Sequence, residues 1–462
     1  MEESDFTGLF LQEVNSKRDE LINYFKVTSS DPSTVPVTEY IQRKLIEVWK
    51  SLSSDYIEKL RDEKDKLRII AVDSSLYGRF YAQGKALYII RSVAVSRQKS
   101  LRHLIIEYDT STHSRNVSRT MKLLAESSEY LVALKALSQI PKEDPTVIVL
   151  DGSLYTRLIH TPMEFNVDRN RDAYIKALSS FLLLYAEASS REVPIIGIAK
   201  DSLSEHLRIV LIKEAISDIL EVLVDKGIKV PNNTIRETSS IVEFFNYCER
   251  LVRKLENRYK KLEEIALLRK FIDELKHRHS DYNLLMSFNL PPGFSLPLLV
   301  GCMRGKCYRR IKKLKEYGIL KFVTKIWKNT LKELDDFHAR EFIAEASKLL
   351  LNLIKLPPLY VLYILPEQRA LPLRIELLLP NTINDISFFS FRNVRFTSLP
   401  SQVLDMVLNV VLNNYADMSV YNTWLFAAHR IAKISLKEFQ AYEAYLRNLG
   451  LDLIPRRRIW LG

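Results

Sequence analysis

The chain has 462 residues, of which 47% are hydrophobic and 27% are charged, a composition typical of a soluble globular protein of two or three domains. Its 68 Lys and Arg exceed its 56 Asp and Glu, and the net charge of +12 indicates either a polyanionic partner or a lysine-rich surface that favours solubility. Three cysteines exclude a disulfide framework and a zinc ligand set, and the acidic start (Glu2, Glu3) argues against a cleavable signal. Lys355 interrupts the most apolar stretch, so we expect a cytoplasmic protein that does not cross a membrane.

The first half of the chain is predicted to form helices and then an α/β sheet. Residues 1–66 are expected to be an N-terminal helical segment, with apolar residues at three- and four-residue steps from Thr38 to Leu60. Residues 67–204 are expected to be the first part of the core, with a hairpin turn or loop around Gly78 and Gly84. The expected strands are 68–73, 86–96, 101–108, 147–150 and 194–199, and the expected helices are 119–140 and 172–189. This order predicts a mixed sheet flanked by helices.

The second half is predicted to be more helical. Residues 205–290 are expected to form a helical insertion similar to a coiled-coil hairpin, because apolar residues recur at three- and four-residue steps between Phe244 and Leu275. The basic outer face of this insertion is either solvated or contacts DNA or a partner protein. Residues 291–462 are expected to contain a basic helical segment, a β-hairpin of 359–365 with 371–379, and C-terminal helices over 401–449 that complete the core domain.

Two segments of similar sequence, residues 69–76 and 147–154, each contain an apolar run that ends on an aspartate, Asp73 or Asp151, followed by small residues. Open α/β sheets bind their ligands at the carboxyl ends of such buried strands. If the strands are neighbours, the two carboxylates would repel each other by about 4 kcal/mol at roughly 4 Å with an effective dielectric constant near 20. A divalent cation turns that repulsion into binding, and Mg²⁺ or Mn²⁺ suits these oxygen ligands. The alternative is that each aspartate only caps the turn that follows it.

A third carboxylate is expected from the helix between the two aspartate strands. Glu126 and Glu129 lie about one helical turn apart, and either can be the helix member, with Glu129 preferred. Three such acids can hold two divalent ions for in-line attack of water on a phosphate. Lys200, directly after the third buried strand, either meets a phosphate oxygen or faces solvent.

The C-terminal half contributes two more candidates. His429 lies in a largely apolar helical stretch, and Tyr421 precedes it by slightly more than two helical turns, so both could approach one face. A histidine in such a stretch can equally be a hydrogen-bonded core residue. Arg374 and Glu376, on one predicted strand, are interpreted as a salt bridge.

The most basic stretch of the chain includes Tyr308 among its cations, and it either contacts phosphates or is an inert surface. Its candidate DNA-binding residues are Arg304, Lys306, Arg309, Arg310, Lys312 and Lys313. The sequence has no G-x-x-x-x-G-K loop, no paired cysteine motifs and no G-x-S-x-G elbow, so an ATPase, a zinc protein and a serine hydrolase have no support.

Taken in chain order, these motifs resemble those of the NurA nucleases, which act with the HerA hexameric translocase in archaeal and some bacterial DNA end processing. The resemblance covers roughly residues 65–445 and rests on residues 71–75, 150–154, 196–202, 292–297, 373–377 and Tyr421 with 428–429. The chain departs from the family pattern at Ser74, where glycine is usual, and at Asn422, where proline is usual.

The resemblance implies an RNase H-like fold, two Mn²⁺ ions with Mg²⁺ as the alternative, and a homodimer with a channel for single- and double-stranded DNA. Carried over by position, Asp73, Glu129 (or Glu126), Asp151 and His429 would be metal-site residues, Tyr421 an active-site neighbour, and Lys200 the residue that orients the scissile phosphate. The implied activity is 5′–3′ exonuclease and single-strand endonuclease cleavage in double-strand break end resection, with a HerA-type hexameric ATPase as partner. The alternatives are a DNA-guiding or docking subunit with little or no catalysis, and another RNase H-like phosphotransferase such as a junction resolvase.

Overall fold

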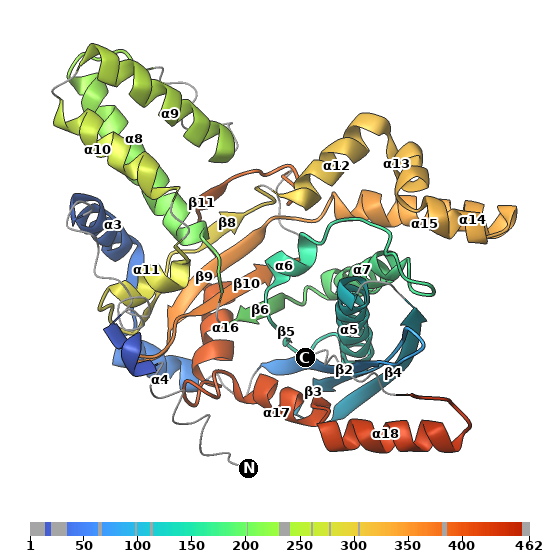
Figure 1. Ribbon diagram of the computed structural model, residues 1–462. Coiled ribbons are helices and arrows are strands. Elements are labelled where there is room, and N and C mark those ends of the chain that lie inside the picture. Colours follow the sequence, from blue (N-terminus) through green and yellow to red (C-terminus); the bar gives the residue numbers. More distant parts are fainter. Residues whose placement is uncertain are drawn as a thin grey trace. The chain divides into compact units, whose positions relative to one another are not determined.

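The computed structural model describes residues 14–19, 35–62, 67–97, 99–110, 114–200, 202–230, 241–259, 262–276, 279–303, 305–380 and 386–454. The chain divides into two compact units (Figure 1). The first comprises Met1–Trp49, Asp201–Thr238 and Glu243–Pro291, and the second comprises Lys50–Lys200, Ser239–Val242 and Pro292–Gly462. Within the described ranges, each helix is too short or too polar to cross a membrane.

The first unit is helical. Its helices are α3 (Val35–Val48), α8 (His206–Asp225), α9 (Ile241–Arg258), α10 (Glu263–Glu274) and α11 (Asp281–Ser287). Helices α9 and α10 run antiparallel, because Arg269 of α10 pairs with Glu256, while Lys276, just after the end of α10, lies 3.9 Å from Glu249, which is nearer the start of α9. Most of the apolar stripe predicted for this region is buried, namely Phe244, Cys248, Leu251, Leu255, Ile265, Leu268 and Ile272. Its other two members, Leu262 and Leu275, are half-buried.

Among the described residues, eleven strands form one sheet with the order β1-β7-β9-β10-β6-β5-β2-β3-β4, and β8 pairs with β9 and β11 beside this path. The strands are β1 (Trp49–Ser51), β2 (Arg68–Phe80), β3 (Lys85–Val95), β4 (Ser100–Thr110), β5 (Thr146–Asp151), β6 (Ile195–Ala199), β7 (Gly293–Ser295), β8 (Leu298–Val300), β9 (Leu359–Leu365), β10 (Leu373–Leu378) and β11 (Val394–Phe396). The central strands β5, β6, β9 and β10 are almost wholly buried, as their continuous apolar runs predict.

The strands β4-β3-β2-β5-β6 form the RNase H-like part of the sheet. Strands β2, β3 and β4 pair antiparallel, whereas β2 with β5 and β5 with β6 pair parallel. Beyond them, β10 runs antiparallel to β6, and β9 runs antiparallel to β10, which confirms the predicted hairpin. The predicted mixed α/β sheet with flanking helices is therefore confirmed.

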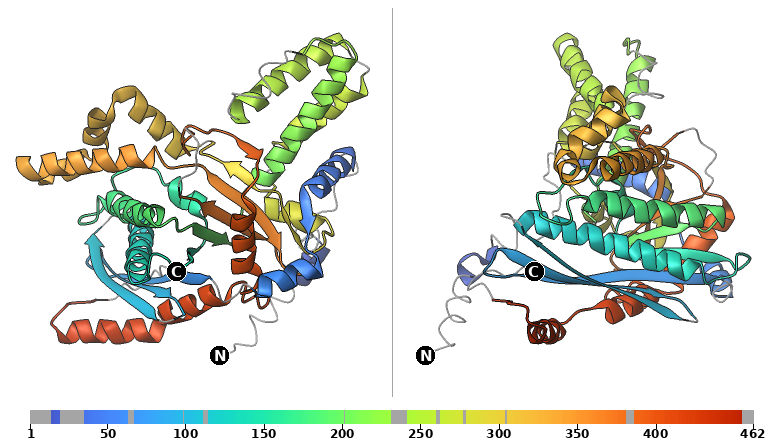
Figure 2. Two further views of the ribbon diagram at one scale, coloured as in Figure 1. Left: turned by 180° about the vertical axis from the view of Figure 1, so that it is seen from behind. Right: turned by 90° about the vertical axis from the view of Figure 1, so that its right-hand side faces the viewer.

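Helices cover both faces of this sheet (Figure 2). Helices α5 (Ser114–Leu137) and α7 (Ala173–Ser190) lie on one face, and α16 (Ser401–Leu412), α17 (Thr423–Ala432) and α18 (Leu436–Asn448) lie on the other. On the α16 side, Ile69 and Ala71 of β2 and Val147 and Val149 of β5 share one core cluster with residues of α16. Because alternate residues of a strand point to opposite faces, the next positions on this side are Asp73 and Asp151. The other helices of the second unit are α4 (Ser54–Asp62), α6 (Leu154–Leu158), α12 (Lys306–Tyr317), α13 (Ile319–Ile326), α14 (Lys328–Glu333) and α15 (Asp336–Leu353).

One local prediction is wrong, and another is confirmed only in part. The helical pattern from Thr38 to Leu60 is interrupted, because α3 ends at Val48 and the chain joins the sheet as β1 before α4 begins. The predicted hairpin is present, since β2 pairs antiparallel with β3, but its turn comes after Phe80, with Gly84 at a φ of 76°, whereas Gly78 lies inside β2 opposite Tyr88. A side chain at Gly78 would meet the end of Met121, so this glycine serves close packing of α5 on the strand.

Candidate metal site at the carboxyl ends of β2 and β5

The site begins with the register of two parallel strands. Ala71 lies opposite Val149 and Val72 opposite Leu150, so Asp73 and Asp151 follow at the same height and on the same face of the sheet. Asp73 is buried and Asp151 is half-buried. Burial raises the pKa of Asp73, and the negative charge of Asp151 raises it further, so the two carboxylates are close enough for the charge of Asp151 to act on Asp73. The sequence prediction that these aspartates lie together agrees with this geometry.

Helix α17 and the loop before it bring two side chains to these carboxylates. His429 Nδ1 lies 2.8 Å from Asp73 Oδ2, and the Tyr421 hydroxyl donates to Asp151 Oδ1 at 2.6 Å. Burial and the charges of both aspartates raise the pKa of Tyr421, so the phenol stays protonated and keeps donating. Asn422 begins α17 by accepting from the backbone N–H groups of Trp424 and Leu425, a cap that the proline usual in the family cannot provide.

Lys200 lies at the open side of the same group. Its Nζ is 3.8 Å from Asp151 Oδ2 and 4.8 Å from the centre of the Tyr421 ring, and its side chain is half-exposed. A solvent-facing cation next to two carboxylates can meet an incoming phosphate without giving up a buried partner.

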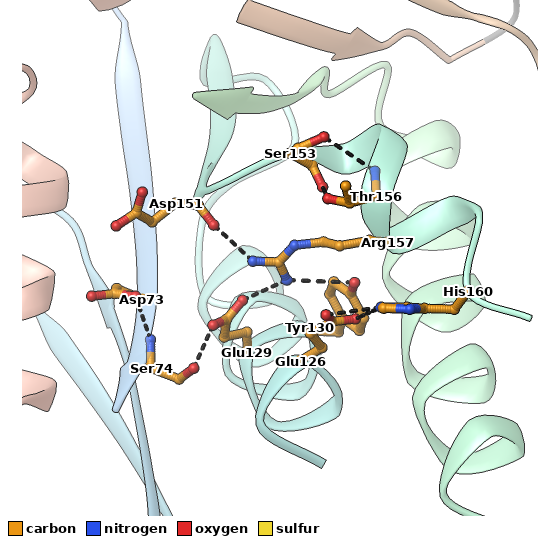
Figure 3. A network of polar contacts seen from close by, with 10 residues as sticks. All are labelled: Asp73, Ser74, Glu126, Glu129, Tyr130, Asp151, Ser153, Thr156, Arg157 and His160. Carbon is orange, nitrogen blue, oxygen red and sulfur yellow. Dashed lines mark hydrogen bonds and ion pairs between the residues drawn. The ribbon is translucent and has the colours of Figure 1, made fainter. Parts of the chain in front are cut away.

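Glu129 approaches from the opposite face of β2 (Figure 3). It is buried on α5, accepts from Ser74 Oγ at 2.5 Å, and is paired with Arg157 at 2.6 Å. Burial raises the pKa of Glu129 to about 7, with Asp73 adding to the rise and Arg157 opposing it. Ser74, which replaces the usual glycine, therefore links the first aspartate's strand directly to this glutamate.

Glu126, the other helix candidate, faces away from the aspartates. Both of its carboxylate oxygens lie 3.0 Å from His160 Nε2. Burial alone would raise the pKa of Glu126, but the hydrogen bond and charge of His160, with the charge of Arg157, hold it below its usual value. Of the two glutamates that the sequence left open, Glu129 is the one beside Asp73.

The side chains of this site are of types that bind a divalent cation, although they are not arranged at coordination distances from one point. In the described part of the chain, no three His, Cys, Asp or Glu side chains are already grouped at ligand spacing. Glu129 is hydrogen-bonded to Ser74 and Arg157. The donor set is nevertheless hard oxygen with one imidazole, which is the set that Mn²⁺ and Mg²⁺ accept. Two carboxylates at the ends of neighbouring strands, where the charge of one raises the pKa of the other, are a further mark of a cation site.

Sequence reasoning missed three groups near the site. Arg157 lies in the last turn of the short helix α6 and His160 follows it, and a five-residue helix gives no detectable periodicity. Glu376 was interpreted only as a strand salt bridge with Arg374; that pair exists at 2.6 Å, but Glu376 also accepts from Ser153 Oγ and from the backbone N–H of Tyr155. A charged residue within an otherwise apolar buried strand was the available signal.

The basic stretch forms α12, with Cys307, Ile311 and Leu314 on its buried side. Its cations point outward: Lys306, Arg309, Lys312 and Lys313 are exposed and Arg310 is partly exposed, whereas Arg304 lies outside the described residues. The helices that follow continue the same charge. From Gly305 to Glu333 the sequence contains ten Lys and Arg and two Glu.

A family model for the NurA domain matches residues 67–434. No curated protein matches the chain. Among solved structures, the NurA nuclease from Sulfolobus solfataricus is 12% identical, with 98% of this chain and 100% of that chain covered and a TM-score of 0.48. A NurA bound to dAMP and manganese is 15% identical, with 96% of each chain covered and a TM-score of 0.40. Because the family model spans most of the chain and contains every site residue described above, this protein belongs to the NurA family.

Proposed function

We propose that this protein is a metal-dependent DNA nuclease that hydrolyses phosphodiester bonds with Mn²⁺, or with Mg²⁺ in its place. Membership of the NurA family supports a nuclease. The observation that carries the proposal is the pair Asp73 and Asp151, which end adjacent parallel strands on one face of the sheet, where the charge of Asp151 raises the pKa of Asp73. Manganese is also the ion named with a solved NurA structure.

Asp73, Asp151, Glu129 and His429 would hold the metal, as two ions. When bound, such ions supply Lewis-acid stabilisation of the charge on the phosphate and on its leaving oxygen. Tyr421 keeps the Asp151 carboxylate oriented through its hydroxyl, and Lys200 places a positive charge where the scissile phosphate enters. His429 is exposed, and its ring either joins the ligands or moves a proton to or from solvent.

DNA would be held along its backbone by the exposed cations of α12. Ten cations against two acids from Gly305 to Glu333 give a surface that attracts phosphates without reading bases. We therefore propose both single- and double-stranded DNA as substrates, with 5′–3′ exonuclease and single-strand endonuclease cleavage. The cellular role that we propose is end resection at double-strand breaks, with a HerA-type hexameric ATPase as partner.

We also propose a homodimer, and the edge strand β4 supports it. On the outer edge of β4 no further strand is paired in the described parts of the chain, and Leu104, Ile106 and Tyr108 are each about half exposed. If two copies of β4 pair antiparallel about Ile105, Leu104 faces Ile106 and His103 faces Glu107, so the strand is complementary to itself. Changing Ile106 to Asp should then convert the dimer to a monomer in light scattering, and a dimer that persists would argue against this interface.

The activity is tested by digestion of end-labelled single- and double-stranded DNA with Mn²⁺, comparing the wild type with Asp73→Asn and Asp151→Asn. We expect metal-dependent cleavage by the wild type and loss of at least about a hundredfold in rate in each variant. If pure wild type binds DNA but does not cut it, the protein is a DNA-guiding subunit. If it cuts only four-way junctions and leaves linear ends intact, it is a resolvase.

A further inference from the structure

The short helix α6 is fixed firmly to the sheet directly behind the site. It begins at Leu154, three residues after Asp151, and its first turn is anchored to β10 by Glu376. Glu376 accepts from Ser153 Oγ at 2.9 Å and from the Tyr155 backbone N–H at 2.5 Å, and its own charge is balanced by Arg374. The residues in the last turn of α6 are therefore held at a defined distance from β5.

That last turn carries Arg157, whose guanidinium joins three elements (Figure 3). Nη1 donates to Glu129 Oε2 at 2.6 Å, and Nη2 donates to the backbone carbonyl of Asp151 at 2.8 Å. Nη1 also lies 3.4 Å from the Tyr130 hydroxyl. The side chain is only 10% exposed, so it cannot reach a DNA phosphate and acts on its neighbours instead.

We propose that Arg157 is a positioning residue for the metal site, and this inference rests on the proposed nuclease function. By binding the carboxylate of α5 with one nitrogen and the carbonyl of the β5 aspartate with the other, it fixes the separation between Glu129 and Asp151. It also supplies the opposite charge that a buried glutamate needs.

The planar guanidinium is what makes this possible. Its two terminal nitrogens are spaced to meet two acceptors at once, whereas the single ammonium of lysine cannot bridge both with the same geometry. Residues that hydrogen-bond to metal ligands without contacting the metal typically contribute 10- to 100-fold to metal affinity. We therefore expect Arg157→Met to weaken Mn²⁺ binding by about 10- to 100-fold and Arg157→Lys to weaken it less.

Arg191 offers a matched control. It is 9% exposed, pairs with Glu187 at 2.6 Å, and donates to the carbonyls of Leu137 and Ile140 at the other end of α5. Arg191→Met thus removes the same kind of buried cation, with one carboxylate and two carbonyl partners, away from the site. Both Met variants should lower the melting temperature in EDTA, but only Arg157→Met should change the affinity for Mn²⁺.

The experiment measures Mn²⁺ affinity by electron paramagnetic resonance of the free ion, without DNA and below the melting temperature of every variant. Weaker binding by Arg157→Met than by Arg191→Met, with partial recovery in Arg157→Lys, supports the proposal. Equal Mn²⁺ affinity in the two Met variants overturns it and leaves Arg157 with a role in stability alone. If instead Asp73→Asn binds Mn²⁺ as wild type does, the proposed metal site itself fails, which is a separate result.

Discussion

The buried pair Arg374–Glu376 predicts a large loss of stability from a small change. Glu376 is fully buried, Arg374 is 2% exposed, and the two charged groups are 2.6 Å apart. Glu376→Gln keeps the shape of the side chain and an oxygen that accepts from Ser153 and Tyr155, but it removes the carboxylate charge that lies 2.6 Å from the Arg374 guanidinium. Breaking one side of a buried ion pair costs about 3–5 kcal/mol, because the remaining charge stays out of water.

A control variant and a rescue variant test whether the loss of the buried counter-charge is what lowers the stability. Glu316 lies 3.8 Å from Lys312 on α12, and their side chains are 50% and 63% exposed. Glu316→Gln should cost only about 0–1 kcal/mol, because water screens such a pair. Replacing both members of the buried pair, with Arg374→Met and Glu376→Gln together, should recover part of the loss, since no lone charge remains.

The assay is thermal unfolding in EDTA, followed by circular dichroism. At about 2 °C or more for each kcal/mol, Glu376→Gln should lower the melting temperature by roughly 5–10 °C, and Glu316→Gln by less than about 2 °C. The reasoning is refuted if the two single variants melt at the same temperature, or if the double variant is less stable than Glu376→Gln alone.

Three further outcomes are expected. Gly197→Ala should lower the free energy of unfolding by about 1–3 kcal/mol and weaken Mn²⁺ binding, because a Cβ there would lie 2.7 Å from a backbone oxygen of the loop after β5. Gly78→Ala should lower it by less in the same denaturation series, because the nearest atom there is the flexible end of a methionine. Tyr421→Phe should lower the cleavage rate about tenfold with little change in melting temperature, because it removes one hydrogen bond to a charged carboxylate; an unchanged rate would speak against this role. Lys312→Ala with Lys313→Ala should weaken duplex binding and reduce the salt dependence of log K by about 0.9 for each phosphate that the protein no longer neutralises, and an unaltered slope would remove α12 from the DNA site.

The parts that sequence could predict are those with local, repeated signals. The apolar runs before Asp73 and Asp151 predicted two buried strands, and the parallel register of these strands in the structure places both carboxylates on one face. Tyr421 and His429 were found because their spacing along the chain is itself a pattern, and each contacts one aspartate.

The parts that sequence could not predict depend on distant contacts. Glu376 binds the start of α6 although the two are more than two hundred residues apart in the sequence, and no local residue spacing predicts that contact. The choice between Glu126 and Glu129 depended on His160 and Arg157, which belong to or follow a helix too short to show a period. The break after α3 likewise arises because β1 joins the sheet, which overrides a helical pattern.

The most direct test of the central claim is anomalous diffraction at the manganese edge from crystals soaked in Mn²⁺. The account predicts a peak within coordination distance of the carboxylates of Asp73 and Asp151, and its loss in Asp73→Asn crystals. Manganese bound elsewhere, with no peak between these two side chains, would contradict it.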